Sequence, residues 1–384
     1  MAIVQVSRIT NRKGLSENLP QLAGAEFGWV IDQRKLYIGN GTLAEGAPAV
    51  GNTEILTQYS DILNLATSYT YKGEHAGYTA QTGPTSGDPV TQSLQAKLDN
   101  FASVLDFGAT GDGVTDDTDA INRALYQLFC RETNTTVRRS LYFPAGTYRV
   151  TQSIAVPPFA QLWGDGPNSA IIEMDVASDS SFGPYVMRTA DSLQQTGVNI
   201  GNNSATPPKQ IVISGMTFTS VEDIDLVLVD RAEQVSFNNV NFEGPLLQSS
   251  LTSAGADLAG VRFDSTVAYT TKQIEFNNCK FSQLTYGINT DENIQGVTVQ
   301  NSQFNTLYQA ILLGDGTPVN GGPEGVRIVQ NLFDAVAKQG IIIGAVAYNV
   351  SAYNIFLNVA NDFLGAGNAA AAIIDISGDN NVSI

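Results

Sequence analysis

The chain has 384 residues, enough for two or more domains that each bury a hydrophobic core. Hydrophobic residues make up 43% of it and charged residues only 15%, which excludes an intrinsically disordered protein. The net charge of −17 disfavours a nucleic-acid partner, because an acidic surface repels polyanions. No apolar run is long enough to span a bilayer and no secretory signal is recognisable, so we expect neither membrane insertion nor export by a signal peptide.

The scarcity of cysteine and histidine limits the chemistry that the chain can perform. Cys130 and Cys279 lie in unrelated contexts, so we expect both to be reduced packing residues in a protein that folds in a reducing cytoplasm. His75 is the single histidine, which argues against a histidine-based metal site and against a Ser-His-Asp triad. We therefore expect no metal and no cofactor.

Residues 1–60 are predicted to form a separate, β-rich module. Alternation of apolar and polar residues at 3–9, and apolar runs at 27–32, 35–41 and 54–57, predict short strands. The charges of the module balance, so the rest of the chain carries the whole negative excess. So small a module buries little apolar surface, which favours an intertwined oligomer. Residues 61–100 are rich in turn-forming residues and are predicted to connect the module to a larger domain at 101–384.

A distinctive motif opens the larger domain. Residues 104–125 read Val-Leu-Asp-Phe-Gly-Ala-Thr-Gly-Asp-Gly-Val-Thr-Asp-Asp-Thr-Asp-Ala-Ile-Asn-Arg-Ala-Leu, which predicts a short strand, a glycine-rich turn and an amphipathic helix. Thr115 is predicted to cap this helix, and Asp116 and Asp117 place negative charge where the first backbone N–H groups are unpaired. Such a helix is suited to cover the open end of a β-structure.

From residue 141 onward a repeat appears. Its segments carry β-branched and aromatic residues around a bend that usually contains asparagine, and they end on Phe218, Phe242, Phe281, Phe304, Phe333 and Leu357. The steps between these residues are 24, 39, 23, 29 and 24, a period typical of parallel β-helix coils whose asparagines stack at a corner. The two longest steps predict insertions at 245–259 and 314–325 that project from the solenoid.

These motifs carry a resemblance to a known family. The 104–125 motif, with the preceding Ser93-Leu-Gln-Ala-Lys-Leu-Asp99, resembles the entry motif of pectate-lyase-like right-handed β-helix proteins, especially bacteriophage tailspikes and tail fibres. Residues 22–32 and 36–41 resemble the N-terminal β-module of phage tail-fibre and baseplate proteins. The resemblance implies an all-β fold: a right-handed parallel β-helix with an N-terminal capping helix, preceded by a virion-attachment module at 1–60. It also implies a homotrimer that docks on other phage tail or baseplate proteins, located in the phage tail after folding in the host cytoplasm.

Three carboxylates are the candidates for catalysis. Glycan hydrolysis needs two carboxylates about 5–9.5 Å apart, and neighbouring coils about 4.8 Å apart can supply them on one face. The densest acidic cluster includes Asp223 and Asp225, which share a side if that segment is extended, and Asp264 follows on a later coil. The alternative is structural, because aspartates in a solenoid bend commonly bond the backbone of the turn.

Three tyrosines, Tyr269, Tyr286 and Tyr308, are candidate glycan-binding residues, because aromatic rings can stack on sugars; each can also be an ordinary half-buried residue of the solenoid. Polygalacturonase-like relatives carry Asn-Thr-Asp, Asp-Asp and Gly-His-Gly motifs, of which only Asn289-Thr-Asp291 occurs in the coils here.

The resemblance predicts a tail spike, tail fibre or baseplate-associated protein whose β-helix recognises a host-surface glycan. Two alternatives stay open: a polysaccharide depolymerase, either a hydrolase or a lyase, and a purely structural virion component.

Overall fold

The computed structural model describes residues 12–47, 49–62, 90–131, 140–175, 185–190, 208–246, 257–265, 270–290, 292–314, 323–344, 348–359, 374–376 and 382–383. They belong to two compact units, Met1–Asn100 and Phe101–Ile384, and each unit is described by itself.

The smaller unit contains a four-stranded sheet. Its strands are β1 (Arg12–Gly14), β2 (Phe27–Val30), β3 (Lys35–Gly39) and β4 (Asn52–Ile55), in that order. β1 runs parallel to β2, whereas β2, β3 and β4 are antiparallel. The strands predicted at 27–32, 35–41 and 54–57 are confirmed with small shifts of their ends. The strand predicted at 3–9 and most of the connector, with His75, lie outside the described residues.

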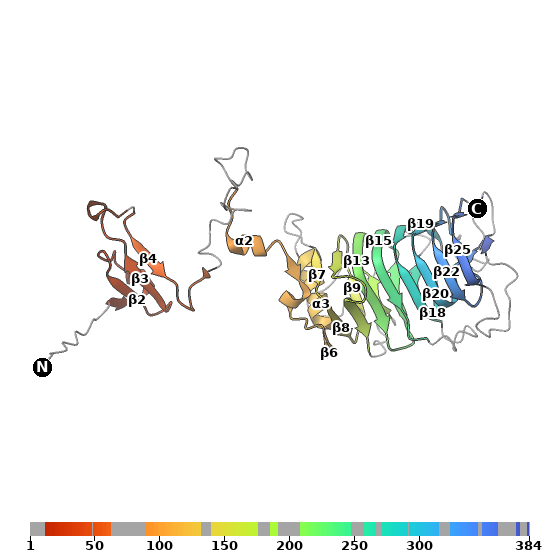
Figure 1. Ribbon diagram of the computed structural model, residues 1–384, viewed down its shortest axis with the longest axis horizontal. Helices are drawn as coiled ribbons and strands as arrows, with labels where there is room; N and C mark the ends of the chain where they lie inside the picture. Colours follow the sequence, from red (N-terminus) through yellow and green to blue (C-terminus); the bar gives the residue numbers. More distant parts are fainter. Residues whose placement is uncertain are drawn as a thin grey trace. The chain divides into compact units, whose positions relative to one another are not determined.

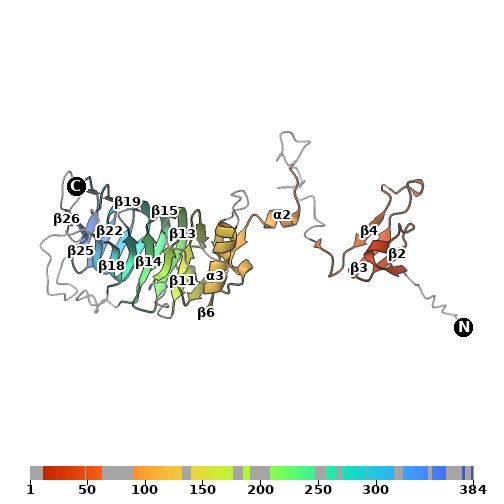
Figure 2. The same cartoon turned by 180° about the vertical axis from the view of Figure 1, so that it is seen from behind.

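The larger unit is the predicted right-handed parallel β-helix, whose three faces we name sheets I, II and III (Figures 1 and 2). Sheet I contains β5 (Ala102–Ser103), β7 (Leu141–Phe143), β10 (Gln161–Gly164), the first halves of β13 (Lys209–Ser220) and β15 (Glu233–Glu243), β17 (Thr271–Asn277), β19 (Ile294–Gln300), β21 (Arg327–Val329), β24 (Val350–Ala352) and β27 (Val382–Ser383). Each strand pairs in parallel with the strand one coil away, so residues at equivalent positions form files along the helix axis.

The other two faces follow the same rule. Sheet II contains β6 (Asp112–Asp116), β8 (Gly146–Val150), β11 (Ala170–Met174), the second halves of β13 and β15, the first halves of β18 (Lys280–Thr290) and β20 (Gln303–Leu313), β22 (Leu332–Val336) and β25 (Ile355–Val359). Sheet III contains β9 (Ile154–Val156), β12 (Tyr185–Thr189), β14 (Asp225–Asp230), β16 (Ala259–Asp264), the second halves of β18 and β20, β23 (Ile341–Ile343) and β26 (Ile374–Ile376).

A file of stacked phenylalanines runs through the core. Its members are Phe218, Phe242, Phe281, Phe304, Phe333 and Phe356, and from Phe242 onward neighbouring ring centroids lie 4.7 or 4.8 Å apart. This distance equals the spacing of hydrogen-bonded strands, so each ring packs on the ring one coil away. The sequence repeat therefore marks the core, with one correction at its end. Phe356 occupies the last position of the file, and the neighbouring Leu357, which the repeat had placed there, is 48% exposed because side chains alternate along a strand.

Asparagines form a second file at the corner between sheets I and II, as the repeat predicted. Asn239, Asn278 and Asn301 all adopt left-handed backbone conformations, with φ of 54°, 55° and 53°. Asparagine tolerates this conformation better than most residues. The side chains also bond asparagines of the coil before. The Asn278 amide donates to Oδ1 of Asn239 in the same file (3.1 Å), and that of Asn301 donates to Oδ1 of Asn277, one residue before the corner (3.2 Å). The insertions predicted next to these coils lie mostly outside the described residues.

Helix α3 (Thr118–Leu125) covers the N-terminal end of the β-helix and continues as a π-helical turn, Tyr126–Arg131 (Figure 1). Its buried residues, among them Ile121, Ala124 and Leu125, join the same hydrophobic core as the strands. The predicted capping helix is thus confirmed. It shields the core of the first coil from water, which an open solenoid end would expose.

The helix begins later than predicted. Thr115 belongs to β6, and the N-cap residue is Asp117. The buried carboxylate of Asp117 accepts hydrogen bonds from the backbone N–H groups of Thr110 (2.7 Å) and Gly111 (3.0 Å), so it holds the glycine-rich turn against the helix. Asp116 accepts a bond from the N–H of the first helical residue (3.0 Å). The carboxylates of Asp116 and Asp117 therefore serve to hydrogen-bond the backbone of the turn and of the helix start.

The phenylalanine file makes a stability prediction. Replacing Phe304 by alanine should lower the free energy of unfolding of the β-helix by about 3–5 kcal/mol, because it leaves a cavity between two stacked rings. Tyr353, whose side chain is 72% exposed on a late coil, is the control: Tyr353→Ala should change that free energy by less than about 0.5 kcal/mol. Urea unfolding followed by circular dichroism measures both, and equal losses would contradict the stacked file as the main stabilising element.

Candidate functional site

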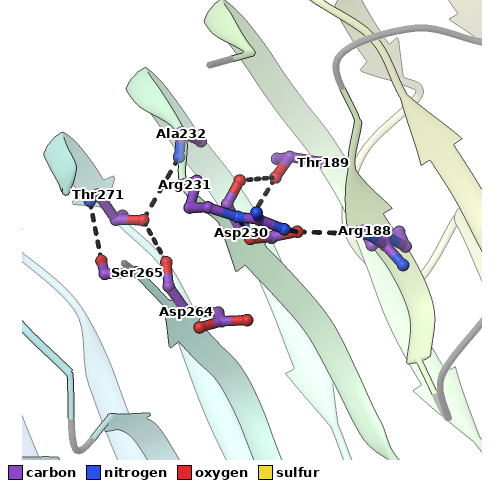
Figure 3. A network of polar contacts seen from close by, with 8 residues as sticks. All are labelled: Arg188, Thr189, Asp230, Arg231, Ala232, Asp264, Ser265 and Thr271. Carbon is purple, nitrogen blue, oxygen red and sulfur yellow. Dashed lines mark hydrogen bonds and ion pairs between the residues drawn. The ribbon is translucent and has the colours of Figure 1, made fainter. Parts of the chain in front are cut away.

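Sheet III carries two of the three carboxylates that the sequence nominated, Asp225 and Asp264. The strands β12, β14 and β16 lie side by side, with Arg188 in register with Leu228 and Leu228 in register with Arg262. At the ends of the same strands, Asp230 lies in register with Asp264. Figure 3 shows the part of this network around Asp230. Because hydrogen-bonded strands are about 4.8 Å apart, charges on neighbouring coils interact directly here.

Asp225 forms a buried ion pair with Arg262. Its side chain accepts bonds from Nε (2.5 Å) and Nη2 (3.2 Å) of Arg262 and from the backbone N–H of Ala259 (2.7 Å), and the residue is only 7% exposed. Burial raises the pKa of Asp225, and the bond to Arg262 opposes this rise. Arg262 also reaches Asp257 (2.9 Å). Asp225 therefore ties β14 to β16, a structural task that leaves little of its carboxylate accessible.

Asp223 does not join Asp225 on one face. The predicted geometry required an extended segment through both residues, but 221–224 form a bend and β14 begins only at Asp225. Asp223 is exposed on that bend. The alternation argument fails because it applies only inside a strand. The expectation that Asp223 and Asp225 share a side is wrong.

Asp230, which was not among the nominated residues, is the most deeply buried acid of this network. It is 2% exposed and accepts bonds from Nε (2.5 Å) and Nη2 (2.9 Å) of Arg231 and from Nη2 of Arg188 (3.2 Å). Its backbone N–H donates to Oγ1 of Thr189 (2.9 Å), and that hydroxyl donates back to the carbonyl of Asp230 (Figure 3). Two arginines thus compensate the charge of one buried carboxylate, which is the arrangement that burial requires.

Asp264 differs from Asp225 and Asp230 in its exposure and in its partners. It is half-buried and takes part in no salt bridge with the described residues. Burial raises the pKa of Asp264, and the nearby charge of Asp230 raises it further. Burial likewise raises the pKa of Tyr185, and so does the charge of Asp225, with which Tyr185 lies in register at the other end of these strands. Of the nominated acids, Asp264 is the one suited to hold and donate a proton.

The candidate tyrosines are not brought together. Tyr286 lies on sheet III, in register with Ala259, and is half-buried. Tyr308 lies on β20 in another part of the coil, where the ammonium of Lys338 sits 5.8 Å from its ring centroid. Tyr269 lies outside the described residues. Among the residues that the structure does describe, there is no group of three or more acids, cysteines or histidines arranged to hold a metal ion.

Sequence reasoning missed a groove on sheet I, which we call the sheet I groove. It has a volume of about 770 Å³ and crosses β10, β13, β15, β17 and β19. Its floor is the outward file of Gln161, Val212, Ser236, Glu275 and Thr298, which lie in register. Along its side runs a corner file that includes Gln210, Gln234 and Gln273. The signal was present in the sequence: these glutamines recur in Lys-Gln-Ile, Glu-Gln-Val and Lys-Gln-Ile at coil spacing.

An aromatic pair lies beside this groove. Trp163 is two residues after Gln161 on β10 and is 38% exposed. Its ring stacks on that of Tyr142 with centroids 4.3 Å apart, and the Tyr142 hydroxyl donates to Asp165 (2.5 Å). The hydrogen bond and the stacking hold an exposed flat ring in a fixed orientation, which lowers the entropic cost of binding another flat or apolar surface to it.

The structure contains no helix, within its described parts, that is long and apolar enough to cross a membrane. Neither cysteine forms a disulfide with a described residue; Cys279 is buried and Cys130 partly buried. Burial raises the pKa of the Cys279 thiol to about 12, so this side chain stays a neutral packing group, in line with its predicted role.

The raised pKa of Asp264 predicts a pH-dependent stability effect. Folding disfavours the ionised form of this carboxyl, so Asp264→Asn should raise the melting temperature at pH 7 by roughly 2–4 °C. Below about pH 4, the ordinary pKa of aspartate, Asp264 is protonated in both the folded and the unfolded protein, so the stability advantage of asparagine should vanish. Calorimetry at pH 7 and pH 3.5 measures the difference. Asp223→Asn on the exposed bend is the control, and an equal gain at both pH values would contradict the prediction.

Comparison with known proteins agrees with this fold. The chain is 23% identical, over 71% of its length, to the pre-neck appendage protein of Bacillus phage B103, and 25% identical, over 63% of its length, to a probable glucan endo-1,3-beta-glucosidase of Arthroderma benhamiae. It spans less than a third of either relative, 30% and 31% respectively. Among solved structures, the Dettilon tailspike protein shares the fold, with a TM-score of 0.51 and 12% identity over 76% of this chain and 64% of that one. Residues 101–312, more than half of the chain, match the model of one family, and the protein is therefore a member of the rhamnogalacturonase A/epimerase, pectate lyase-like family.

Proposed function

We propose that this protein is a component of a bacteriophage tail spike or tail fibre whose β-helix binds a glycan on the host surface. The observation that carries the proposal is the sheet I groove with the exposed Trp163 beside it. A fixed indole ring beside a long polar groove is suited to sugars, which present apolar ring faces and hydroxyl edges. The relationship to a phage appendage protein supports the virion location.

The proposal extends to assembly. Residues 1–60 would attach the chain to another tail or baseplate protein, and three chains would associate side by side. Three copies of a weak glycan site on one particle raise the effective affinity without new contacts. Association of β-helices would also cover apolar side chains that the single chain exposes, such as Ile355 and Leu357, which are 59% and 48% exposed.

The assembly proposal makes a mass prediction. Light scattering on the purified full chain should give three times the chain mass of 40.9 kDa, unchanged on tenfold dilution. A monomer at every concentration would contradict the trimer, and would leave glycan recognition to be judged by binding alone.

The glycan-binding proposal makes a second prediction. Trp163→Ala should weaken binding to the host polysaccharide about tenfold, since stacking on an exposed ring contributes on the order of 1 kcal/mol. Tyr353→Ala removes an even more exposed aromatic ring, from a late coil outside the groove, and should leave affinity unchanged. Isothermal titration calorimetry with polysaccharide from susceptible cells measures both, and a Trp163 variant that binds like the unmodified protein would overturn the site.

Glycan cleavage is the second candidate function, favoured by the raised pKa of Asp264 beside the charge of Asp230 on sheet III. In this scheme protonated Asp264 gives its proton to the glycosidic oxygen, a water adds to the sugar carbon, and an ionised carboxylate takes the proton that the water loses. The original assignment of Asp223 and Asp225 to this role stays part of the proposal. Release of reducing ends by the unmodified protein should be lost in Asp264→Asn if Asp264 is the acid, and in Asp223→Asn if Asp223 is the base. Tyr353→Ala, which changes an exposed residue far from both roles, should keep the activity.

A further inference from the structure

The corner between sheets III and I has an unusual file of residues. Phe159, Gln210, Gln234, Gln273, Gly296, Gly325 and Tyr348 all adopt left-handed backbone conformations, with φ between 57° and 67°. The strand registers place them one above another, one residue per coil. Glycine adopts this conformation without penalty, and two coils use it. Three successive coils nevertheless carry glutamine, which has a conformational cost there.

The three glutamine side chains do not stabilise the fold through hydrogen bonds to the described residues. Gln210, Gln234 and Gln273 are exposed, and their amides form no hydrogen bond with other described residues. The asparagine file at the next corner behaves differently, since its amides bond one another. A residue that costs conformational energy, could be replaced by glycine and makes no bond of its own is expected to serve something outside the chain.

The chemistry of the groove points to an uncharged ligand. An amide offers donors and an acceptor together, which is what a sugar hydroxyl needs as a partner. The lining of the groove includes a single charged side chain, Glu275, and that carboxylate already accepts a bond from Gln300 (2.9 Å). The net charge of −17 adds a repulsive field against polyanions. Both observations disfavour a polysaccharide rich in uronic acids or phosphate.

The geometry also indicates the direction of the ligand. The groove crosses five strands, which corresponds to roughly 19 Å along the axis. The amides of three coils are distributed along this length and not around one point, and Trp163 lies on β10, beside one end of the groove. A single sugar could contact only part of them, whereas an extended chain parallel to the axis could contact all.

We infer that the sheet I groove binds a neutral polysaccharide chain laid along the β-helix axis, and that Gln210, Gln234 and Gln273 are the residues that hydrogen-bond its hydroxyl groups. The inference rests on the proposed function and specifies its ligand. The occupant is a glycan and not a second copy of this chain, because the groove carries a row of exposed amides that can exchange their water partners for hydroxyls.

The test replaces all three glutamines by glycine. Glycine removes the side chain and also relieves the left-handed backbone, so the variant should fold at least as stably as the unmodified protein. Gln330→Gly is the matched control, because Gln330 is an exposed glutamine with φ of 58° in the asparagine file. Binding of the full chain is measured by calorimetry to a panel of purified bacterial polysaccharides, half neutral and half anionic.

The expected result is binding to a neutral polysaccharide that is about 10–100-fold weaker in the triple variant and unchanged in Gln330→Gly. Equal binding by the triple variant would overturn the inference, and so would binding confined to anionic polysaccharides; in both cases the proposed function stands. A lower molar mass of the triple variant would mean that the groove holds a second copy and would also overturn it. If no polysaccharide binds at all, both the inference and glycan recognition fail.

Discussion

The whole β-helix depends on one constraint: each coil must place its residues in register with those of the previous coil. Parallel strands about 4.8 Å apart force side chains at equivalent positions into contact. The phenylalanine file satisfies this constraint in the core, where successive rings stack at 4.7 or 4.8 Å. The corners satisfy it with a left-handed residue on coil after coil, because the chain must turn at the same point each time. A shift of one residue would turn the buried file outward, as the pair Phe356 and Leu357 illustrates.

The same constraint divides the surface into faces with separate tasks. Once the backbone of a corner is set, its side chains are free to differ from one corner to another. At one corner Asn239, Asn278 and their neighbours bond along the file and reinforce the stack. At the other, glutamines point into the sheet I groove. The outer face of sheet III carries ion pairs that bind neighbouring strands together. Stacking therefore supplies the rigidity that a long polar groove needs to present a fixed pattern of hydrogen-bonding groups.

The arginines of this acidic chain are placed where carboxylates are buried. Arg262 neutralises Asp225, and Arg188 and Arg231 share Asp230. Removing one partner of such a pair would leave an uncompensated charge away from water. Asp225 and Asp230, which belong to the densest acidic cluster of the sequence, therefore stabilise the fold through their ion pairs. Asp264 lies at the margin of this network, close enough to Asp230 for its pKa to rise and accessible enough to meet a ligand. Asp264 thus combines a raised pKa with partial exposure, the two properties that the proposed cleavage step would need.

The sequence alone determined the architecture, because stacking repeats itself in the chain. Recurrent phenylalanines, asparagines at bends and the Asp-rich motif before Ile121 each reflect a local rule that needs no knowledge of distant contacts. It did not determine the sites. The geometry assumed for Asp223 and Asp225, the helix start at Thr115 and the surroundings of Tyr286 and Tyr308 all depended on where strands begin and which coil faces which. The partner of Asp225 is 37 residues away, and Trp163 meets Tyr142 across a coil. Only the tertiary structure brings such residues together, since coil lengths vary and a change of one residue moves a side chain to the opposite face.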